Sequence, residues 1–397
     1  MIPLRLASFG AAYFFVGGVG LSYWSVWLQS HGADPAEIGT IYMSRQFVTV
    51  AATLTIGWLA HRLVQQQRVL MLVLVTVAIA TLATQDYAYG FWPLWLTTLV
   101  WGASWHPLLS LGESVSVSVT RQRGLDYGRV RVWGSVTFIG GAVAAGFAVA
   151  TIGVPWVLYL SIIGALLLVP CILWLPIPQR LEATPSDAPP RRVTAGDLLR
   201  RPAFVLFLAA VGCTQAGHAV IYSFGTIGWR AAGIGDDTIS FLWAEGILAE
   251  IVLFFFAGVV TARLGPVRLM MLGAGGSVVR WSLMPLLGDS LPALLVLQAL
   301  HALTFGATHL AAMTFLQRAV PGSAMTLAQS LYYGLANGLP VALVYQLAGV
   351  LYDRAGTQAY YAMAVLTAVG LLAATALAWR WRGEFLVQDT ARASGAH

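Results

Sequence analysis

The sequence predicts an all-α protein that crosses a membrane about twelve times, and three observations support this fold class. Hydrophobic residues make up 58% of the 397 positions and charged residues only 10%, too few to cover a soluble protein of this length. The apolar residues come in stretches of about twenty, the length that a helix needs to cross a hydrocarbon core about 30 Å thick. The arginines lie almost entirely between alternate stretches, as is typical of cytoplasmic loops.

In the first half of the chain, polar breaks between apolar windows predict spans at 4–28, 37–60, 68–85, 91–119, 129–150 and 153–175. The second half predicts spans at 202–228, 238–260, 267–287, 291–316, 323–350 and 357–380. The longest polar segment, 176–201, separates the two sets and is rich in proline and arginine. We therefore expect two six-helix bundles, 1–175 and 202–382, with a cytoplasmic linker at 176–201 and a cytoplasmic tail at 383–397.

Arginine placement also orients the spans. With the N-terminus in the cytoplasm, all but four of the 22 arginines lie on the cytoplasmic side. Arg230 and Arg354 are then external, whereas Arg45 and Arg280 lie within spans. This bias predicts that both termini are cytoplasmic. The first apolar stretch is interpreted as a retained span, because it lacks a convincing small-residue cleavage site.

Ionisable residues within the spans are candidates for function, because a charge at mid-bilayer costs several kcal/mol. The first half has three: Arg45, His106 and Glu113. The second half has a denser set: His218, Glu245, Glu250, Arg280, His301 and His309. Because successive spans run in opposite directions, most of the second set is expected in one layer, with His309 two turns deeper than His301.

Two interpretations of this layer remain open. Glu250 and Arg280 could form an ion pair that locks the helices together. Alternatively, Arg280 binds a substrate carboxylate through two hydrogen bonds, while Glu250 or a histidine exchanges a proton. Glu113 fits either a gate or a proton site, since it could meet the arginines of the following loop. Glu245 is expected nearer the external side.

Aromatic and amide side chains near this depth complete the predicted site. The aromatic candidates are Trp24, Tyr222 and Trp243, although interfacial anchoring and packing are the usual roles of such residues. The amide candidates are Gln215, Gln329 and Asn337, which could bind substrate or hydrogen-bond neighbouring helices.

The sequence contains no phosphate-binding loop, metal-ligand cluster or nucleophile elbow. We therefore expect a protein that is not an enzyme and that has no cofactor and no metal. The basic pI of about 9.5 is accounted for by the cytoplasmic arginines, so no nucleic-acid partner is expected.

Two loops carry related motifs. The loop after the second span reads GWLAHR and the loop after the eighth reads GVVTARLG. Both resemble the loop motif G-x-L-A-D-R-x-G-R-K of the major facilitator superfamily, with His61 and Ala262 in place of the usual Asp. Two copies six spans apart fit a duplicated six-helix unit. Arg62 and Arg263 are therefore expected at a cytoplasmic gate, although positive-inside anchoring would also place arginines there.

The run DYGRVRVWGS at 126–135 opens the fifth span and resembles the DYGRVRLWGS signature of the phenylpropionate-porter branch of that superfamily. Asp126, Arg129 and Arg131 belong to this run and are expected at the gate. Further segments similar to that branch occur in both halves: WSVW at 24–27, QAGH at 215–218, LW at 242–243, AE at 249–250, VRW at 279–281 and HLAAM at 309–313. The resemblance implies proton-coupled uptake of a small organic acid across a bacterial inner membrane by alternating access.

The chain is also similar to the lactose-permease-like group, in which a Glu, an Arg and a His on the eighth, ninth and tenth spans support sugar binding and proton coupling. Glu250, Arg280 and His301 occupy the corresponding spans, which leaves sugar open as a substrate class. Glu113 stands where the porter branch typically has Asp, and Glu245 is an addition.

We therefore predict a monomeric, proton-coupled importer of an aromatic or related monocarboxylate similar to 3-phenylpropionate. Sugar or nucleoside symport and export of drugs or metabolites by proton antiport are the alternatives, and sodium coupling stays open. A non-transporting scaffold or sensor fits less well, because no soluble segment is longer than the linker.

Overall fold

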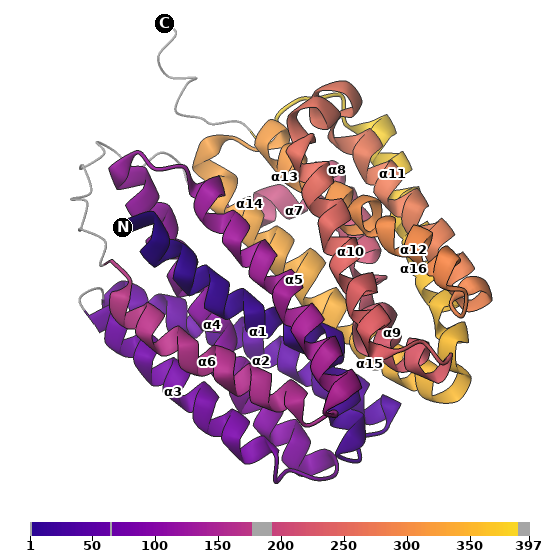
Figure 1. Ribbon diagram of the computed structural model, residues 1–397. Helices are drawn as coiled ribbons and strands as arrows, with labels where there is room; N and C mark the ends of the chain where they lie inside the picture. Colours follow the sequence, from indigo (N-terminus) through magenta and orange to yellow (C-terminus); the bar gives the residue numbers. More distant parts are fainter. Residues whose placement is uncertain (1, 64–65, 177–192, 388–397) are drawn as a thin grey trace, which may run out of the picture. The chain divides into compact units, whose positions relative to one another are not determined.

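The computed structural model describes residues 2–63, 66–176 and 193–387, and its regular elements are all helical (Figure 1). The helices of the first half are α1 (Ile2–Ser30), α2 (Pro35–Arg62), α3 (Gln67–Gln85), α4 (Phe91–Arg123), α5 (Tyr127–Thr151) and α6 (Trp156–Trp174). Each coincides with one predicted span to within a few residues. The prediction of an all-α protein is confirmed for the described residues.

The second half is more interrupted. Its α-helices are α7 (Ala195–Leu199), α8 (Pro202–Ala216), α9 (Ala219–Ala231), α10 (Asp236–Phe255), α11 (Ala257–Leu287), α12 (Leu291–Ala299), α13 (Thr308–Ala319), α14 (Met325–Tyr332), α15 (Leu339–Ala355) and α16 (Tyr360–Arg380). Short π or 3₁₀ segments join several of them: η2 (Ala302–Ala307), η3 (Gly322–Ala324), η4 (Tyr333–Gly338) and η5 (Gly356–Ala359). Most of the predicted linker and tail, at 177–192 and 388–397, lies outside the described residues.

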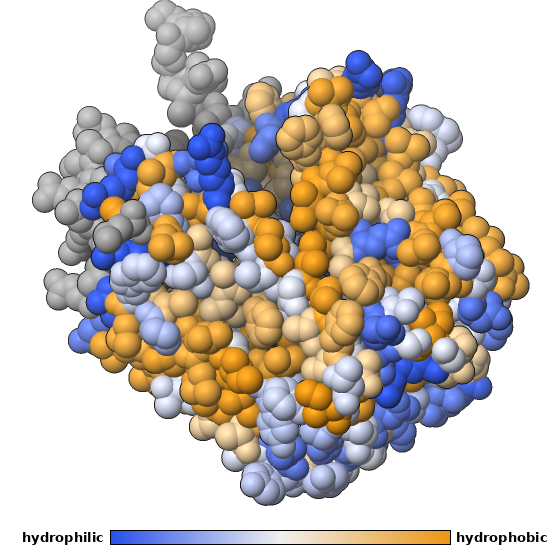
Figure 2. Space-filling model, in the orientation of Figure 1, coloured by the Kyte–Doolittle hydropathy of each residue, from blue (hydrophilic) through white to orange (hydrophobic). Residues whose placement is uncertain are grey.

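Eight stretches of the described chain are long and apolar enough to cross a membrane. Helices α2, α4 and α11 have 28, 33 and 31 residues but are not among the eight. On the visible surface, hydrophobic side chains predominate along the flanks of the helices and hydrophilic ones gather near their ends (Figure 2). Lipid-facing flanks with wet ends are expected of membrane helices, while the number of crossings stays a prediction.

The described chain divides into two compact units. Unit 1 consists of Met1–Arg180 with Ile221–Ala244 and Tyr345–Gly356, and unit 2 consists of Leu181–Val220, Glu245–Val344 and Thr357–His397. Unit 1 therefore includes most of α9, the start of α10 and the end of α15 from the second half of the sequence. The two predicted six-helix bundles were defined by the order of the spans along the chain, whereas the two units group residues that lie close together. The bundle boundaries remain a prediction.

Close helix packing in unit 1 depends on small residues. A Cβ at Gly18 of α1 would overlap the carbonyl of Phe138 on α5, and a Cβ at Gly141 would overlap the carbonyl of Phe15. Glycine at both positions lets the two backbones touch, as in small-residue interfaces between membrane helices. The pair α1 and α5 thereby forms a rigid part of this unit.

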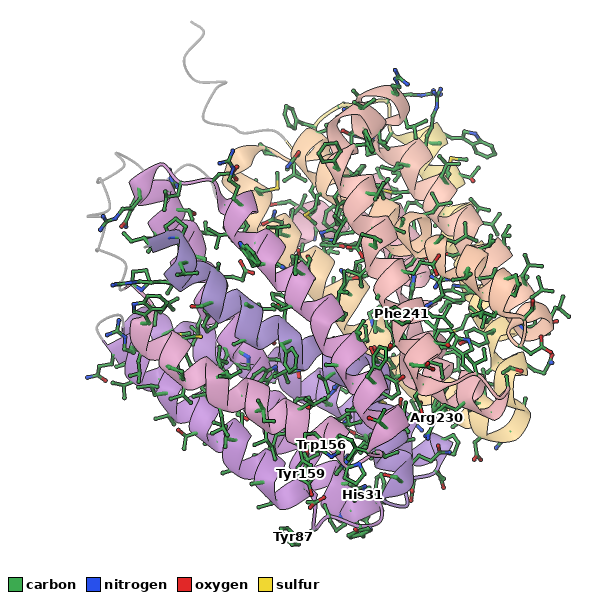
Figure 3. All side chains as sticks on the ribbon, in the orientation of Figure 1. His31, Tyr87, Trp156, Tyr159, Arg230 and Phe241 are labelled. Carbon is green, nitrogen blue, oxygen red and sulfur yellow. The ribbon has the colours of Figure 1, made fainter. Side chains whose placement is uncertain are left out.

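Loops that are predicted to be external lie together at one end of unit 1. His31, Tyr87 and Trp156 come from three different connections and occupy the same end (Figure 3). The His31 ring stacks on Trp27 at 4.0 Å and on Tyr89 at 4.8 Å. The Gly90 amide donates to the His31 carbonyl at 2.9 Å. These contacts tie the turn after α1 to the turn after α3.

Segments from the second half of the sequence are attached at the same end. The Tyr23 hydroxyl donates to the Asp236 carbonyl at 2.6 Å, and the Thr226 hydroxyl donates to the Ser22 carbonyl at 2.5 Å. Helices α2 and α15 touch where a Cβ at Gly39 would come within 2.8 Å of the Gly349 Cα. Helices of both sequence halves thus meet near the predicted external face.

Candidate functional site

A helix break brings His218 into the interior of unit 2. Helix α8 ends at Ala216, and two turn residues separate it from α9, where the sequence predicted one span. A Cβ at Gly217 would overlap the Thr367 side chain and lie 3.1 Å from the Trp281 indole nitrogen. The glycine thus allows α11 and α16 to approach the break, and His218 beside it is fully buried.

A π segment positions the next histidine. His301 immediately precedes η2, which replaces the expected continuous helix between α12 and α13. Insertions of this kind change the helical phase and recur at functional sites. Helix α10 packs closely against this region, since a Cβ at Gly246 would lie 3.4 Å from the His301 Cβ, and one at Gly306 would lie 3.2 Å from the Glu250 Cγ.

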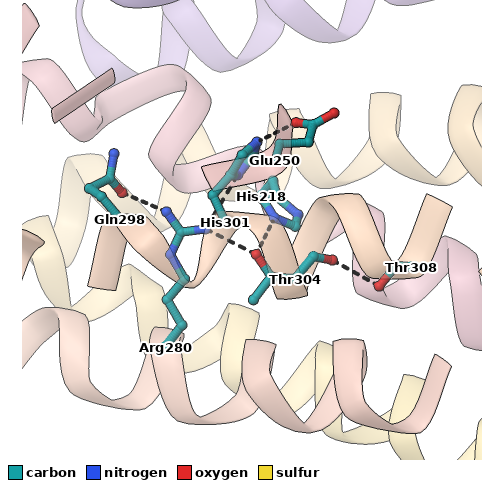
Figure 4. Close-up of polar contacts among 7 residues, drawn as sticks. All are labelled: His218, Glu250, Arg280, Gln298, His301, Thr304 and Thr308. Carbon is teal, nitrogen blue, oxygen red and sulfur yellow. Dashed lines mark hydrogen bonds and ion pairs between the residues drawn. The ribbon is translucent and has the colours of Figure 1, made fainter. Parts of the chain in front are cut away.

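Arg280 lies at the centre of a buried polar cluster (Figure 4). Its guanidinium donates to the Gln298 side-chain oxygen at 2.5 Å and to the Thr304 hydroxyl at 3.0 Å. A third contact, at 3.5 Å, is with His301 Nδ1, and the guanidinium lies 4.6 Å from the centre of the Trp281 ring. The residue is only 1% exposed. Polar side chains and an aromatic face therefore surround a positive charge in the protein interior.

The cluster continues from Arg280 in two directions. Glu250 Oε2 lies 3.4 Å from His301 Nε2, and Thr304 Oγ1 lies 3.1 Å from His218 Nε2. Glu250, His301, Arg280, Thr304 and His218 therefore form one connected polar chain (Figure 4). A carboxylate in contact with an imidazole can exchange a proton with it. The predicted layer of Glu, Arg and His thus contains direct contacts.

His309 belongs to a neighbouring group. The Phe305 ring stacks on His301 at 5.2 Å and on His309 at 6.3 Å. His309 Nδ1 lies 3.3 Å from the Tyr332 hydroxyl, and Asn337 hydrogen-bonds the same tyrosine. A column of rings along η2 and the start of α13 therefore connects the cluster to the tyrosine and the amide.

The other predicted residues of unit 2 lie around this core. Gln215 is buried, and its backbone carbonyl oxygen lies 3.2 Å from His218 Nδ1. Gln329 is partly exposed on α14. Glu245 is partly buried on α10, and its Oε2 has no hydrogen-bond partner among the described residues.

Three predicted aromatic residues lie in unit 1 instead. Trp243 donates its indole N–H to the Thr226 hydroxyl at 2.9 Å, and its ring lies 6.4 Å from Tyr222. Trp24 stacks on Trp101 at 4.9 Å. The structure thus divides the predicted substrate-binding residues between the two units.

Glu113 is paired across α4 and α5. Its carboxylate lies 3.2 Å from Arg131 Nε and accepts a hydrogen bond from the Tyr127 hydroxyl. The Arg131 guanidinium also lies 4.0 Å from the centre of the Phe14 ring. This pairing matches the expectation that Glu113 meets an arginine of the DYGRVR run.

The remaining gate candidates lie at helix ends. Asp126 caps α5 by accepting from the Gly128 amide at 2.8 Å, and it lies 3.5 Å from Arg129. Both side chains are exposed, so this pair adds little stability; they line a cavity of about 770 Å³ beside the start of α1. Arg62 lies 4.0 Å from the centre of the Trp58 ring. Arg263 is exposed on α11, two residues before a break at Gly265 with φ of 69°.

From the sequence we did not single out Gln298 or Thr304, which hold the Arg280 guanidinium. Both lie three residues from His301 along the chain, so they fall near the same helix face. Their spacing from a histidine within a span was the signal that could have identified them.

Long apolar helices around a buried chain of ionisable groups are the arrangement of a membrane transport protein. The chain belongs to the MFS_1 like family, whose profile matches residues 4–363. It is therefore a transporter of the major facilitator type and not an enzyme.

Similar proteins include transporters for different solutes. The probable 3-phenylpropionic acid transporter of Escherichia coli (strain K12) is 31% identical over 362 residues, covering 89% of this chain and 92% of that protein. The maltose permease of Geobacillus stearothermophilus is 27% identical over 386 residues, covering 93% of each chain. Among solved structures, the nucleoside transporter NupG has a TM-score of 0.76 at 17% identity, covering 96% of this chain and 100% of that one. This structural likeness supports the fold.

Proposed function

We propose that this protein is a symporter that takes up a small aromatic monocarboxylate, similar to 3-phenylpropionate, together with a proton. The observation that carries the proposal is the contact of 3.4 Å between Glu250 and His301 inside the buried cluster of Arg280. The substrate class is supported by the 31% identity to a probable 3-phenylpropionic acid transporter over 89% of the chain.

The charge of the cluster accounts for coupling. With Glu250 ionised, its negative charge offsets the positive charge of Arg280. Protonation of Glu250 leaves a net positive charge in a site of low dielectric, which attracts a carboxylate anion. Protonation therefore favours anion binding, and by linkage the bound anion favours protonation. His301, in contact with both groups, is proposed to carry the proton between Glu250 and the aqueous space.

Proposed roles follow for the other polar residues. His309, Glu113 and Glu245 are proposed as further groups on the proton path. Arg280 supplies the positive charge, and a direct contact with the substrate would require that Gln298 release the guanidinium. The proposed substrate contacts are completed by His218, Tyr222, Trp243, Gln215, Gln329, Asn337 and Trp24.

Alternating access is the proposed mechanism of movement. We propose twelve spans in two bundles, 1–175 and 202–382, in a monomer of a bacterial inner membrane with both termini in the cytoplasm. The contacts at the predicted external face, Tyr23 with Asp236 and Gly39 with Gly349, would then break when the external side opens. On the cytoplasmic side, the proposed gate consists of Arg62, Asp126, Arg129, Arg131 and Arg263.

The experiment that tests this function is uptake into proteoliposomes driven by an imposed pH gradient. Labelled 3-phenylpropionate should accumulate when the outside is acidic, and a sodium gradient without a pH gradient should not drive it. Maltose and uridine should be transported poorly. If only the sugar or the nucleoside accumulates, the proposed aromatic acid is the wrong substrate class. If accumulation depends on sodium alone, proton coupling is refuted.

A further inference from the structure

We infer that Arg45 on α2 is the residue that binds the substrate carboxylate, within an aromatic site built by α1, α2 and α4 of unit 1. The aromatic-acid part of this inference rests on the proposed function. The anion-binding part rests on the surroundings of Arg45 alone.

Arg45 lies near the middle of a helix that runs from Pro35 to Arg62. Its guanidinium lies 4.7 Å from the centre of the Tyr42 ring. A Cβ at Gly102 of α4 would come within 2.8 Å of the Arg45 Cγ. The missing side chain at Gly102 therefore leaves the space in which the aliphatic part of Arg45 lies against α4.

Arg45 forms no ion pair with an acidic side chain among the described residues. Three tyrosines and a histidine interact electrostatically with it: Tyr13, Tyr42, Tyr345 and His106. Among the described residues, no side chain forms an ion pair or a hydrogen bond with the Arg45 guanidinium. A guanidinium at the middle of a membrane helix without an acidic partner is costly, and an anion is the ligand that removes this cost.

Arg45 is also accessible. Arg45 and His106 are both partly exposed, although each lies near the middle of its helix. The close approach to Gly102 of α4 and the electrostatic interactions with Tyr13 of α1 and Tyr345 of α15 place Arg45 on the protein-facing side of α2. Because lipid would not solvate the charge, a partly exposed guanidinium on that side is suited to a polar ligand.

A second donor lies beside Arg45. Thr40 and Thr55, on the same helix, donate their hydroxyls to the carbonyl four residues earlier, at 3.0 and 2.8 Å. The buried Thr49 hydroxyl makes no such bond among the described residues. A Cβ at Gly102 would lie 3.3 Å from the Thr49 hydroxyl oxygen and 2.8 Å from the Arg45 Cγ. The Thr49 hydroxyl therefore lies beside the aliphatic part of Arg45 and is a further polar group next to the arginine.

Stacked aromatic pairs lie on α1 and α4, the helices of unit 1 that carry Tyr13 and Gly102. Tyr13 of α1 stacks on Trp105 of α4 at 5.0 Å, with 9° between the ring planes, and Trp24 stacks on Trp101 at 4.9 Å. The buried Trp101 indole nitrogen, next to Gly102 in sequence, has no partner among the described residues. A guanidinium that lies 4.7 Å from the centre of the Tyr42 ring, in a unit rich in aromatic side chains, suits a ligand with an aryl group a few bonds from a carboxylate.

The test measures binding by titration calorimetry of purified full-length protein at neutral pH. The two ligands are 3-phenylpropionate and its neutral amide. Arg45→Gln should weaken binding of the acid about 10- to 100-fold, since a charged hydrogen-bonding partner is lost, while binding of the amide should change little. The affinity of Arg45→Lys for the acid should lie between those of the wild type and Arg45→Gln, because lysine keeps the charge and loses the planar guanidinium. Arg123→Gln, at the exposed end of α4, is the matched control and should match the wild type.

Gly102→Ala gives an independent variant that keeps every charge. The new methyl group should displace the Arg45 side chain and weaken binding of the acid several-fold, again with little effect on the amide. If Arg45→Gln and Gly102→Ala both still prefer the acid over the amide as strongly as the wild type does, the proposed site is overturned and the proposed function stands. Binding of the acid through Arg45 without proton-coupled uptake would refute the proposed function and leave the site standing. A wild-type protein that binds no acid would refute both.

Discussion

Arg280 and Arg45 both lie in the interior of long helices, yet their surroundings differ in kind. Arg280 is 1% exposed and donates to Gln298 and Thr304. Arg45 is partly exposed and rests on the Tyr42 ring and on the surface left open at Gly102. A guanidinium with built-in hydrogen-bond partners is part of the protein's own structure, whereas one with no hydrogen-bond or ion-pair partner among the described residues is suited to a ligand that binds and leaves.

The two regions also differ in what they can do with a proton. The Arg280 region contains a carboxylate in contact with a histidine, Glu250 with His301. In the Arg45 region, His106 and tyrosines interact with the arginine, and no acid among the described residues forms an ion pair with it. This division suggests that the Arg280 region handles the proton and that the Arg45 region adds a binding group for the anion. The following predictions test that division, starting from the largest expected effect.

Glu250→Gln should remove proton coupling. An amide cannot release a proton, so accumulation driven by a pH gradient should fall about 100-fold, the usual scale for loss of a proton-transfer group. Exchange of labelled for unlabelled acid at equal pH needs no net proton movement and should persist. Asp289→Asn, on an exposed acid outside the cluster, serves as the control for loss of a carboxylate. Full accumulation by Glu250→Gln would show that the proton is handled elsewhere.

Arg280→Ala should destabilise the protein far more than Arg45→Ala does. Removing the Arg280 guanidinium leaves buried partners such as Gln298 and Thr304 without their donor, which we expect to lower the free energy of unfolding by about 3–5 kcal/mol. For Arg45→Ala we expect about 1 kcal/mol or less, because no such partner is stranded. Thermal or denaturant unfolding in detergent measures both values. Equal losses of stability would remove the distinction between the two arginines.

Gly39→Trp should slow transport at the predicted external face. Its side chain would be forced between α2 and α15, where even a Cβ comes within 2.8 Å of the Gly349 Cα and of the Tyr345 carbonyl oxygen. We expect turnover to fall about 10-fold, because the external contacts cannot close again, while binding of the acid is retained. In this variant, a cysteine introduced at position 22 in place of Ser22 should react faster with a labelling reagent added from outside. Unchanged labelling would indicate that these contacts do not form a gate.

Glu113→Gln should have the smallest effect. The Glu113 and Arg131 side chains are 29% and 37% exposed, so solvent screens their attraction and we expect a cost of about 1 kcal/mol or less. Uptake of the acid should fall only a few-fold, with the substrate concentration for half-maximal uptake little changed. A loss of accumulation as large as that of Glu250→Gln would instead place a proton site in unit 1.

The helices of the fold could largely be predicted from sequence, because apolar length responds directly to the bilayer, whereas the orientation drawn from arginine placement remains a prediction. The break at Gly217 could not, since it depends on Thr367 and Trp281 approaching from helices far away in sequence. Helix depth correctly predicted a layer with Glu250, Arg280 and His301. It could not predict which of them touch, because η2 changes the helical phase just after His301.

Arg45 illustrates a different limit. Its position within a span was evident from the sequence, but a lone arginine gave no sign of what surrounds it. Its environment depends on a glycine of α4 and on tyrosines from α1, α2 and α15. Such a site becomes visible only when helices far apart in the sequence are placed together.

The most direct test of the central claim measures proton movement with a pH-sensitive dye in the medium outside wild-type proteoliposomes. When 3-phenylpropionate is added outside without any imposed gradient, a symporter should carry protons inward with the acid, so that the weakly buffered external medium becomes alkaline. Glu250→Gln should abolish this signal while still exchanging the acid. Wild-type transport of the acid with no accompanying alkalinisation would contradict the account.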